Sequence, residues 1–167
     1  KCEAFGRVER QVNQMIRLVD DLMDVSRITR GKIKIHRKPV NLCEILGTAI
    51  ETIQPLIDEK QHTLSIEKVA IPVWVNGDLI RLSQIFSNII NNAAKYTPPG
   101  GNIEVRISTF DGKVTITVKD NGEGIPPDKL ETVFDMFSQV EGALERSQGG
   151  LGIGLTLVKR LNISLSK

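Results

Sequence analysis

The apolar residues near the start of the chain repeat with the spacing of an amphipathic helix. Between Val8 and about Arg30 they fall alternately four and three residues apart, at Val8, Val12, Met15, Val19 and Leu22, with Ile16, Met23 and Val25 widening the stripe. Gly31 then suits the left-handed turn that ends many helices. The pattern predicts a long amphipathic helix that packs either against its own domain or in a bundle between subunits.

Two further helices are predicted from polar caps that precede apolar stripes. Asn41 with Glu44 three residues later predicts a helix start, and the buried face comprises Leu42, Ile45, Leu46, Ala49, Ile50, Ile53 and Ile57. Asp78 predicts a second start, for a helix that runs to about Tyr96. Its apolar face comprises Leu79, Leu82, Ile85, Phe86, Ile89, Ile90 and Ala93. The segment Pro98-Pro99-Gly100-Gly101 ends this helix, because proline cannot continue the hydrogen-bond ladder.

Short segments of alternating polarity predict the strands. They lie around Ile33 and Ile35, at Thr63 to Ile66, and at Val73 to Val75. A hairpin is predicted from Asn102 to Lys119, across the turn Asp111-Gly112. Strands mixed with helices predict an α/β (α+β) sandwich, in which one mixed, largely antiparallel sheet is covered by helices.

Composition narrows the class of protein. The 167 residues are 40% apolar and 25% charged, as in about one globular domain. The net charge of +2 and the few aromatic residues argue against nucleic-acid binding. Cys2 and Cys43, with only His36 and His62, cannot assemble a structural zinc site, and the thiols suit a cytosolic setting. The sequence predicts no signal peptide or membrane span, and its start at Lys1 predicts a piece of a longer protein.

The predicted helix from Asp78 to Tyr96 has a second, polar face. Asn88, Asn92 and Lys95 lie four and three residues apart and therefore share it. Two amides one turn apart can offer oxygens to a hard cation that also binds phosphate, and Lys95 can meet phosphate directly. The alternative is an ordinary solvated face.

Two glycine clusters follow the hairpin. In Asp120-Asn121-Gly122-Glu123-Gly124 the glycines would let a ligand approach the backbone, and the carboxylate could accept a hydrogen bond from an adenine amino group. The alternative is a turn with its own need for Asp, Asn and Gly. The cluster Gly149 to Gly154 opens an amphipathic segment and predicts an anion site that is neither a P-loop nor a Rossmann turn. The polar run Ser138 to Gln148 between them predicts a mobile flap.

These segments together resemble a known set of motifs. Asn88-x-x-x-Asn92-Ala-x-Lys95-Tyr96, then Asp120 to Ile125, then Phe134-x-x-Phe137, then Gly150 to Leu155 resemble the N, G1, F and G2 boxes of sensor histidine kinases of two-component signalling. The resemblance implies the Bergerat fold of the GHKL superfamily. Residues 1–31 resemble the second helix of the dimerisation hairpin, and residues 32–167 resemble the catalytic ATP-binding domain without part of its C-terminal strands. The wording from Phe134 to Val140 is most similar to hybrid-type kinases.

The resemblance implies a role for each motif residue. Asn88 and Asn92 would hold Mg²⁺, Lys95 would meet phosphate, and Tyr96 would stack near the adenine. Asp120 would read the adenine amino group, Gly122 and Gly124 would let the base approach, and Arg146 would contact the γ-phosphate. The remaining nucleotide contacts would come from Ile125, Phe137, Gly150, Leu151, Gly152, Ile153, Gly154 and Leu155. Leu151 stands where relatives often have Thr.

The resemblance also implies an activity. The chain would bind Mg-ATP and transfer the γ-phosphoryl group to a histidine on a homodimeric dimerisation domain, for relay to the receiver domain of a response regulator. It would be a cytoplasmic domain, compatible with a parent anchored in the inner membrane. His36 and His62 lack the acceptor context and are expected to be surface or strand residues, so the chain should not phosphorylate itself.

Alternative activities are a GHKL ATPase, a serine-directed kinase or a non-catalytic nucleotide-dependent scaffold. ATP-hydrolysing relatives place a Glu one turn before the magnesium Asn, and here that position is Asn88. An amide cannot take a proton from water, which favours transfer over hydrolysis.

Overall fold

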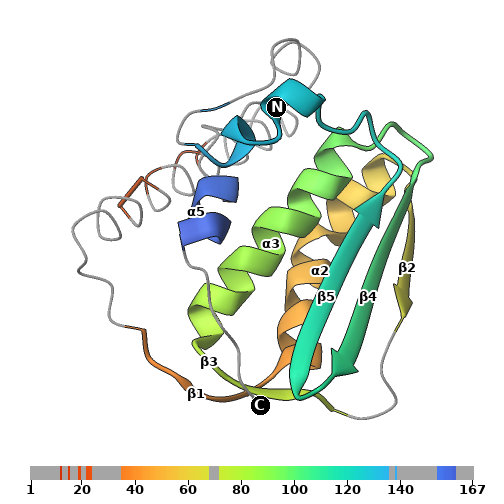
Figure 1. The fold of residues 1–167 in the computed structure, drawn as a ribbon. Coiled ribbons are helices and arrows are strands. Elements are labelled where there is room, and N and C mark those ends of the chain that lie inside the picture. The colour runs from red at the N-terminus through yellow and green to blue at the C-terminus, as the bar shows by residue number, and fades with distance from the viewer. Residues whose placement is uncertain are drawn as a thin grey trace.

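The computed structural model describes residues 35–67, 72–135, 138 and 154–160, together with Val12, Met15, Val19, Leu22 and Met23. The elements are β1 (Lys38–Asn41), α2 (Leu42–Glu59), β2 (Thr63–Glu67), β3 (Trp74–Gly77), α3 (Leu79–Tyr96), β4 (Asn102–Phe110), β5 (Lys113–Asp120), the 3₁₀ turns η1 (Pro127–Lys129) and η2 (Thr132–Phe134), and α5 (Gly154–Arg160). Helices α2 and α3 pack together against one face of the sheet formed by β2, β4 and β5, and α5 packs along α3 (Figure 1). The predicted fold class is confirmed.

The strands form two hydrogen-bonded sheets in the described part of the chain, where the sequence predicted one. The larger sheet has the order β2-β4-β5, with β4 parallel to β2 and antiparallel to β5. The smaller sheet pairs β1 with β3 antiparallel. The larger sheet is therefore mixed, as predicted.

The β4–β5 hairpin has the predicted two-residue turn. Phe110 pairs with Lys113 across Asp111 and Gly112. The φ angles of Asp111 and Gly112 are 47° and 71°. A turn with two positive φ angles matches the right-handed twist of the flanking strands, so the local sequence sets the register of this pair.

Helix α2 begins and buries its apolar face as predicted. The Oδ1 of Asn41 accepts a hydrogen bond from the Cys43 N–H at 3.1 Å, and the Asn41 Nδ2 donates to the Glu44 Oε1 at 3.0 Å. The first bond satisfies a backbone donor that has no partner within the helix, and the second holds the Asn41 side chain in place. All seven residues predicted for the buried face are buried.

Helix α3 also spans the predicted residues. The Oδ1 of Asp78 accepts from Ile80 N at 3.0 Å and Arg81 N at 3.3 Å, and its Oδ2 accepts from His36 N at 2.9 Å. Burial raises the pKa of this carboxyl, but the N–H groups of His36, Arg81 and Ile80 outweigh burial, so the pKa is lowered overall. The helix ends at Tyr96, where the N–H of Thr97 donates to the carbonyl of Ala93.

The core lies between the two long helices and the larger sheet. Its fully buried side chains include Leu42 from α2, Leu82 and Ile90 from α3, and Ile103 and Val105 from β4. Burial of each such side chain contributes about 1.5–3 kcal/mol to folding. This core fixes α3 against the sheet, and α3 carries four of the predicted site residues, Asn88, Asn92, Lys95 and Tyr96.

Besides the number of sheets, two further details of the sequence prediction are wrong. Ile35 is exposed and lies outside any strand, because the segment that pairs with Trp74–Gly77 is Lys38–Asn41; Ile33 lies outside the described residues. Pro39 is tolerated there because β1 has a partner on only one side among the described strands. Leu79 is 43% exposed, since the line of α3 that faces the core begins one turn later, at Leu82, and ends at Ala94.

The predicted N-terminal helix is described at five positions. Val12, Met15, Val19, Leu22 and Met23 are helical, and they are 47–66% exposed. At these positions the apolar stripe is therefore not packed against its own domain. No helix in the described part of the chain is long and apolar enough to cross a membrane.

Candidate functional site

The polar face of α3 forms the base of the candidate site. Asn88, Asn92 and Lys95 are all half-buried on this helix. The sequence of α3 contains no acidic residue. The groups that this face offers are therefore amides and one ammonium, with no carboxylate among them.

Helix α5 begins beside Asn88. The Nδ2 of Asn88 lies 3.5 Å from the Gly154 carbonyl oxygen, at the limit of a hydrogen bond. A Cβ at Gly154 would lie 3.4 Å from the Asn88 Cγ, an ordinary van der Waals distance, so the two elements are in contact here and a small side chain would also fit. Leu155 follows and is half-buried. The structure thus brings the end of the last glycine cluster to the predicted magnesium residues, 66 positions apart in sequence.

The Asp120 cluster meets the other end of α3. The Oδ1 of Asp120 accepts a hydrogen bond from Gly122 N at 2.9 Å. A Cβ at Gly122 would lie 2.7 Å from the Tyr96 carbonyl oxygen, closer than Cβ atoms come to backbone. Gly122 therefore lets this loop pack on the end of α3, whatever it does for a ligand. Gly124 has a φ of 71° and open space at the Cβ position, so there it is the backbone conformation that favours glycine.

Two aromatic side chains border this region. The Lys95 Nζ lies 5.1 Å from the centroid of the Tyr96 ring, and Tyr96 is 43% exposed. In η2, the ring of Phe134 lies 5.6 Å from the Lys159 Nζ of α5. Ile125 is 42% exposed. The motif containing Phe134 is therefore linked to α5, and through it to α3.

Six of the predicted site residues lie outside the described part of the chain. They are Arg146, Phe137, Gly150, Leu151, Gly152 and Ile153. Of the predicted flap, only Ser138 is described. The predicted site residues that the structure does describe lie on or beside α3. Those of the Asp120 cluster, which follows β5, lie at its C-terminal end, and those of α5 lie along its side.

The described residues include no cluster of three or more His, Cys, Asp or Glu side chains that could hold a metal ion. Asn88 and Asn92 offer amide oxygens, one turn apart on α3. Amide oxygens suit Mg²⁺, which keeps several waters and takes phosphate oxygens for the rest of its shell. These two side chains fit a magnesium ion that arrives bound to a nucleotide. By themselves they do not supply all the ligands of the ion.

Lys60 and His62 were not predicted to belong near this site. The Lys60 Nζ donates to the carbonyls of Ala94 at 3.1 Å and Lys95 at 2.6 Å, and it lies 3.5 Å from that of Thr97. His62 was expected at the surface or in a strand, yet it is 8% exposed and its Nε2 lies 3.0 Å from the Ala94 oxygen. No local pattern signals these contacts, because they join residues 32 to 37 positions apart.

Comparisons with known proteins show the family to which the chain belongs. Residues 77–165 match the family described as "Histidine kinase-, DNA gyrase B-, and HSP90-like ATPase". The chain is 34% identical over 154 residues to the autoinducer 2 sensor kinase/phosphatase LuxQ of Vibrio vulnificus, covering 88% of this chain and 18% of LuxQ. It is 32% identical over 157 residues to hybrid signal transduction histidine kinase D of Dictyostelium discoideum, covering 91% of this chain and 10% of that protein.

A solved structure has a similar fold. Full-length ShkA in complex with AMPPNP superposes with a TM-score of 0.75 at 28% identity, covering 95% of this chain and 33% of ShkA. The chain spans at most a fifth of the length of the two curated relatives above. The family match covers more than half of the chain, and it includes α3, the Asp120 cluster and α5. The chain therefore belongs to the histidine kinase-, DNA gyrase B- and HSP90-like ATPases, and within them to the sensor histidine kinases of two-component signalling.

Proposed function

We propose that this chain binds Mg-ATP on the polar face of α3 and transfers the γ-phosphoryl group to a histidine on a dimerisation domain. The observation that carries the proposal is that two distant segments converge on α3: α5 contacts Asn88, and the Asp120 cluster packs on the Tyr96 backbone, directly after Lys95. The close backbone approach at Gly122 makes the second of these contacts possible, because a Cβ there would lie 2.7 Å from the Tyr96 carbonyl oxygen.

Each element would contribute one part of nucleotide binding. The amide oxygens of Asn88 and Asn92 would hold Mg²⁺, which neutralises phosphate charge and orients the phosphoryl group. The Lys95 ammonium would contact phosphate, and the exposed Tyr96 ring would border the adenine. Asp120 would accept from the adenine amino group while its Oδ1 also holds Gly122 N. The resemblance assigns the phosphate cradle to residues 150–154 and the γ-phosphate contact to Arg146.

The side chains of α3 favour transfer over hydrolysis. Water must lose a proton to attack the γ-phosphorus, and α3 has no acidic residue to accept it. A neutral histidine nitrogen is already a nucleophile. It would form the N–P bond as the P–O bond to ADP breaks, and the ring proton would pass to solvent. The chain's task is then to hold and orient the γ-phosphoryl group.

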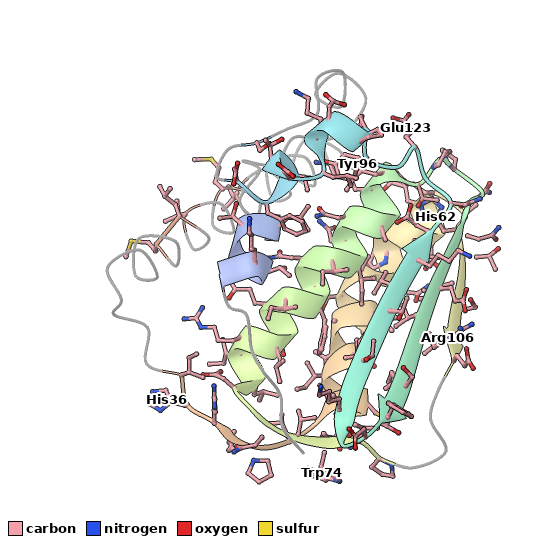
Figure 2. All side chains as sticks on the ribbon, viewed as in Figure 1. His36, His62, Trp74, Tyr96, Arg106 and Glu123 are labelled. Carbon is pink, nitrogen blue, oxygen red and sulfur yellow. The ribbon has the colours of Figure 1, made fainter. Side chains whose placement is uncertain are left out.

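The acceptor histidine would lie outside this chain. His62 is buried with its Nε2 against the Ala94 carbonyl, and His36 lies at the end of the molecule opposite Tyr96 (Figure 2). We therefore expect no self-phosphorylation. Residues 1–31 would be the second helix of the dimerisation hairpin, and the exposed stripe at Val12, Met15 and Val19 is typical of a helix that packs between subunits. A response-regulator receiver domain would take the phosphoryl group from the acceptor.

The test is phosphotransfer to a separately produced dimerisation hairpin that carries the acceptor histidine. The hairpin is mixed with this chain, labelled ATP and Mg²⁺, and phosphate that is acid-labile and alkali-stable is measured. Asn92→Ala is compared with Asn91→Ala, a matched control on the exposed side of the same helix. We expect Asn92→Ala to reduce transfer by about 100-fold, the scale of a lost positioning contact. Asn91→Ala should transfer at the wild-type rate.

Three results would contradict the proposal. Equal transfer by both Asn variants would remove the role of Asn92. Turnover of ATP without any phosphohistidine would favour the ATPase alternative. Stable phosphate on His36 or His62 in the chain alone would show that the acceptor lies within these residues.

A further inference from the structure

The turn that joins α2 to β2, residues 60–62, is held by three backbone hydrogen bonds. Lys60 N donates to the Leu56 carbonyl at 3.1 Å, Gln61 N to Asp58 at 3.1 Å, and His62 N to Ile57 at 2.9 Å. Gln61 has a φ of 56°, the left-handed conformation in which helices often end. We call residues 60–62 the α2–β2 corner. Its backbone bonds fix the directions in which the side chains of Lys60 and His62 leave it.

Both side chains point at the C-terminal end of α3. The last carbonyls of a helix have no partner within the helix and carry its negative dipole end. Here the Lys60 ammonium donates to the carbonyls of Ala94 and Lys95, and the His62 ring meets the Ala94 carbonyl as well. Burial lowers the pKa of Lys60, Glu59 raises it, and Lys95 lowers it further. The ammonium is thus partly desolvated against these carbonyls.

The corner also holds the turn that follows α3. The Lys60 carbonyl accepts from Gly100 N at 2.8 Å, and Thr63 N donates to the Gly101 carbonyl at 2.9 Å. The Lys60 Nζ lies 3.5 Å from the Thr97 carbonyl. The backbone is therefore held at several points from residue 94 to residue 101. Lys95 and Tyr96 lie within this held segment, and the carbonyl of Tyr96 is the surface on which Gly122 packs.

We propose that Lys60, assisted by His62, is a positioning residue for nucleotide binding. It would act through the backbone, by fixing the segment from which the side chains of Lys95 and Tyr96 leave α3. Lys60 itself need not touch the nucleotide. The inference rests on the proposed function, since Lys60 can position Lys95 and Tyr96 for a nucleotide only if the nucleotide binds on α3.

The experiment compares the two ends of α3 in this chain. Lys60→Met removes the ammonium at the C-terminal end, and Asp78→Ala removes the cap at the N-terminal end. Both changes weaken α3, but only the first frees residues 94–97. Affinity for Mg-ATP is measured by calorimetry at a temperature where circular dichroism shows every variant folded. We expect Lys60→Met to raise Kd about tenfold or more, as misplaced binding groups do. Lys60→Arg should restore Kd to within about twofold, because Arg also donates to carbonyls.

A second pair keeps the test decisive if Lys60→Met does not fold. His62→Leu removes one of the two side-chain partners of the Ala94 carbonyl, whereas His62→Gln retains a side-chain donor. We expect weaker nucleotide binding for His62→Leu than for His62→Gln, with both chains folded.

The outcomes separate the two proposals. Tight binding by wild type together with unchanged Kd in folded Lys60→Met and His62→Leu would overturn the positioning role alone. So would an Asp78→Ala variant that loses as much affinity as Lys60→Met at equal loss of Tm, because the effect would then be helix stability. A wild-type chain that binds no Mg-ATP would overturn the proposed function and this inference together.

Discussion

The variant Gly122→Ala tests whether Gly122 is needed only for the approach of a nucleotide or also for packing against Tyr96. If Gly122 serves only the approach of a nucleotide, the methyl group should lower affinity and leave the nucleotide-free chain as stable as wild type. The structure gives it a packing role as well, because the added Cβ would lie 2.7 Å from the Tyr96 carbonyl oxygen and 3.1 Å from the Tyr96 carbonyl carbon. The backbone on both sides must then move apart.

The size of the effect follows from overpacking. Inserting a methyl group into a closely packed site costs about 1–3 kcal/mol. For a chain of this size, Tm falls by roughly 2–4 °C for each kcal/mol. The Asp120 Oδ1, which would also lie 2.7 Å from the new Cβ, must give way and weaken its hydrogen bond to residue 122. We therefore expect a lower Tm without nucleotide and a weaker affinity for Mg-ATP.

The matched control is Gly112→Ala at the tip of the β4–β5 hairpin. Gly112 has a φ of 71° and open space at its Cβ position, so alanine there costs about 1–2 kcal/mol through backbone strain alone. The tip lies at the opposite end of β5 from Asp120. Gly112→Ala should lower Tm by a similar amount and leave Kd unchanged. A Gly122→Ala chain with wild-type Tm in differential scanning calorimetry would refute the packing argument.

Two predictions concern stability away from the site. Asp78→Asn should weaken the dependence of stability on pH in acid. The folded pKa of Asp78 lies below its ordinary value of 3.8, so between these two values the unfolded chain binds more protons than the folded chain. The free energy of unfolding of wild type therefore decreases as the pH is lowered through that window, and the variant lacks this contribution. Urea unfolding from pH 7 to pH 3 should show the gap between wild type and variant narrowing as pH falls, and a constant gap would contradict the assignment. Gly47→Ala in α2 should stabilise the chain by about 0.5–1 kcal/mol, because alanine is the better helix former and nothing lies within 4 Å of the new Cβ. A lower Tm for this variant would mean that α2 is packed differently at Gly47.

Much of the fold was predictable because its determinants are local. Asn41 and Asp78 cap helices through bonds to residues two or three positions away, and Asp111-Gly112 sets a hairpin through its own backbone angles. The apolar period of α2 predicted its buried face residue by residue. For α3 it missed the exposure of Leu79, since the rotation of a helix against a sheet depends on both partners.

The motif residues could likewise be read from the sequence, but not the contacts that hold them. Spacing alone puts Asn88, Asn92 and Lys95 on one face of α3, because an α-helix has a fixed period. Three contacts are visible only in the tertiary structure. They are the packing of Gly122 on Tyr96, the contact of Gly154 with Asn88, and the contacts of the Lys60 and His62 side chains with the carbonyls at the end of α3. They join residues 26 to 66 positions apart, and a carbonyl at a helix end gives no sign in the sequence of which distant side chain will satisfy it.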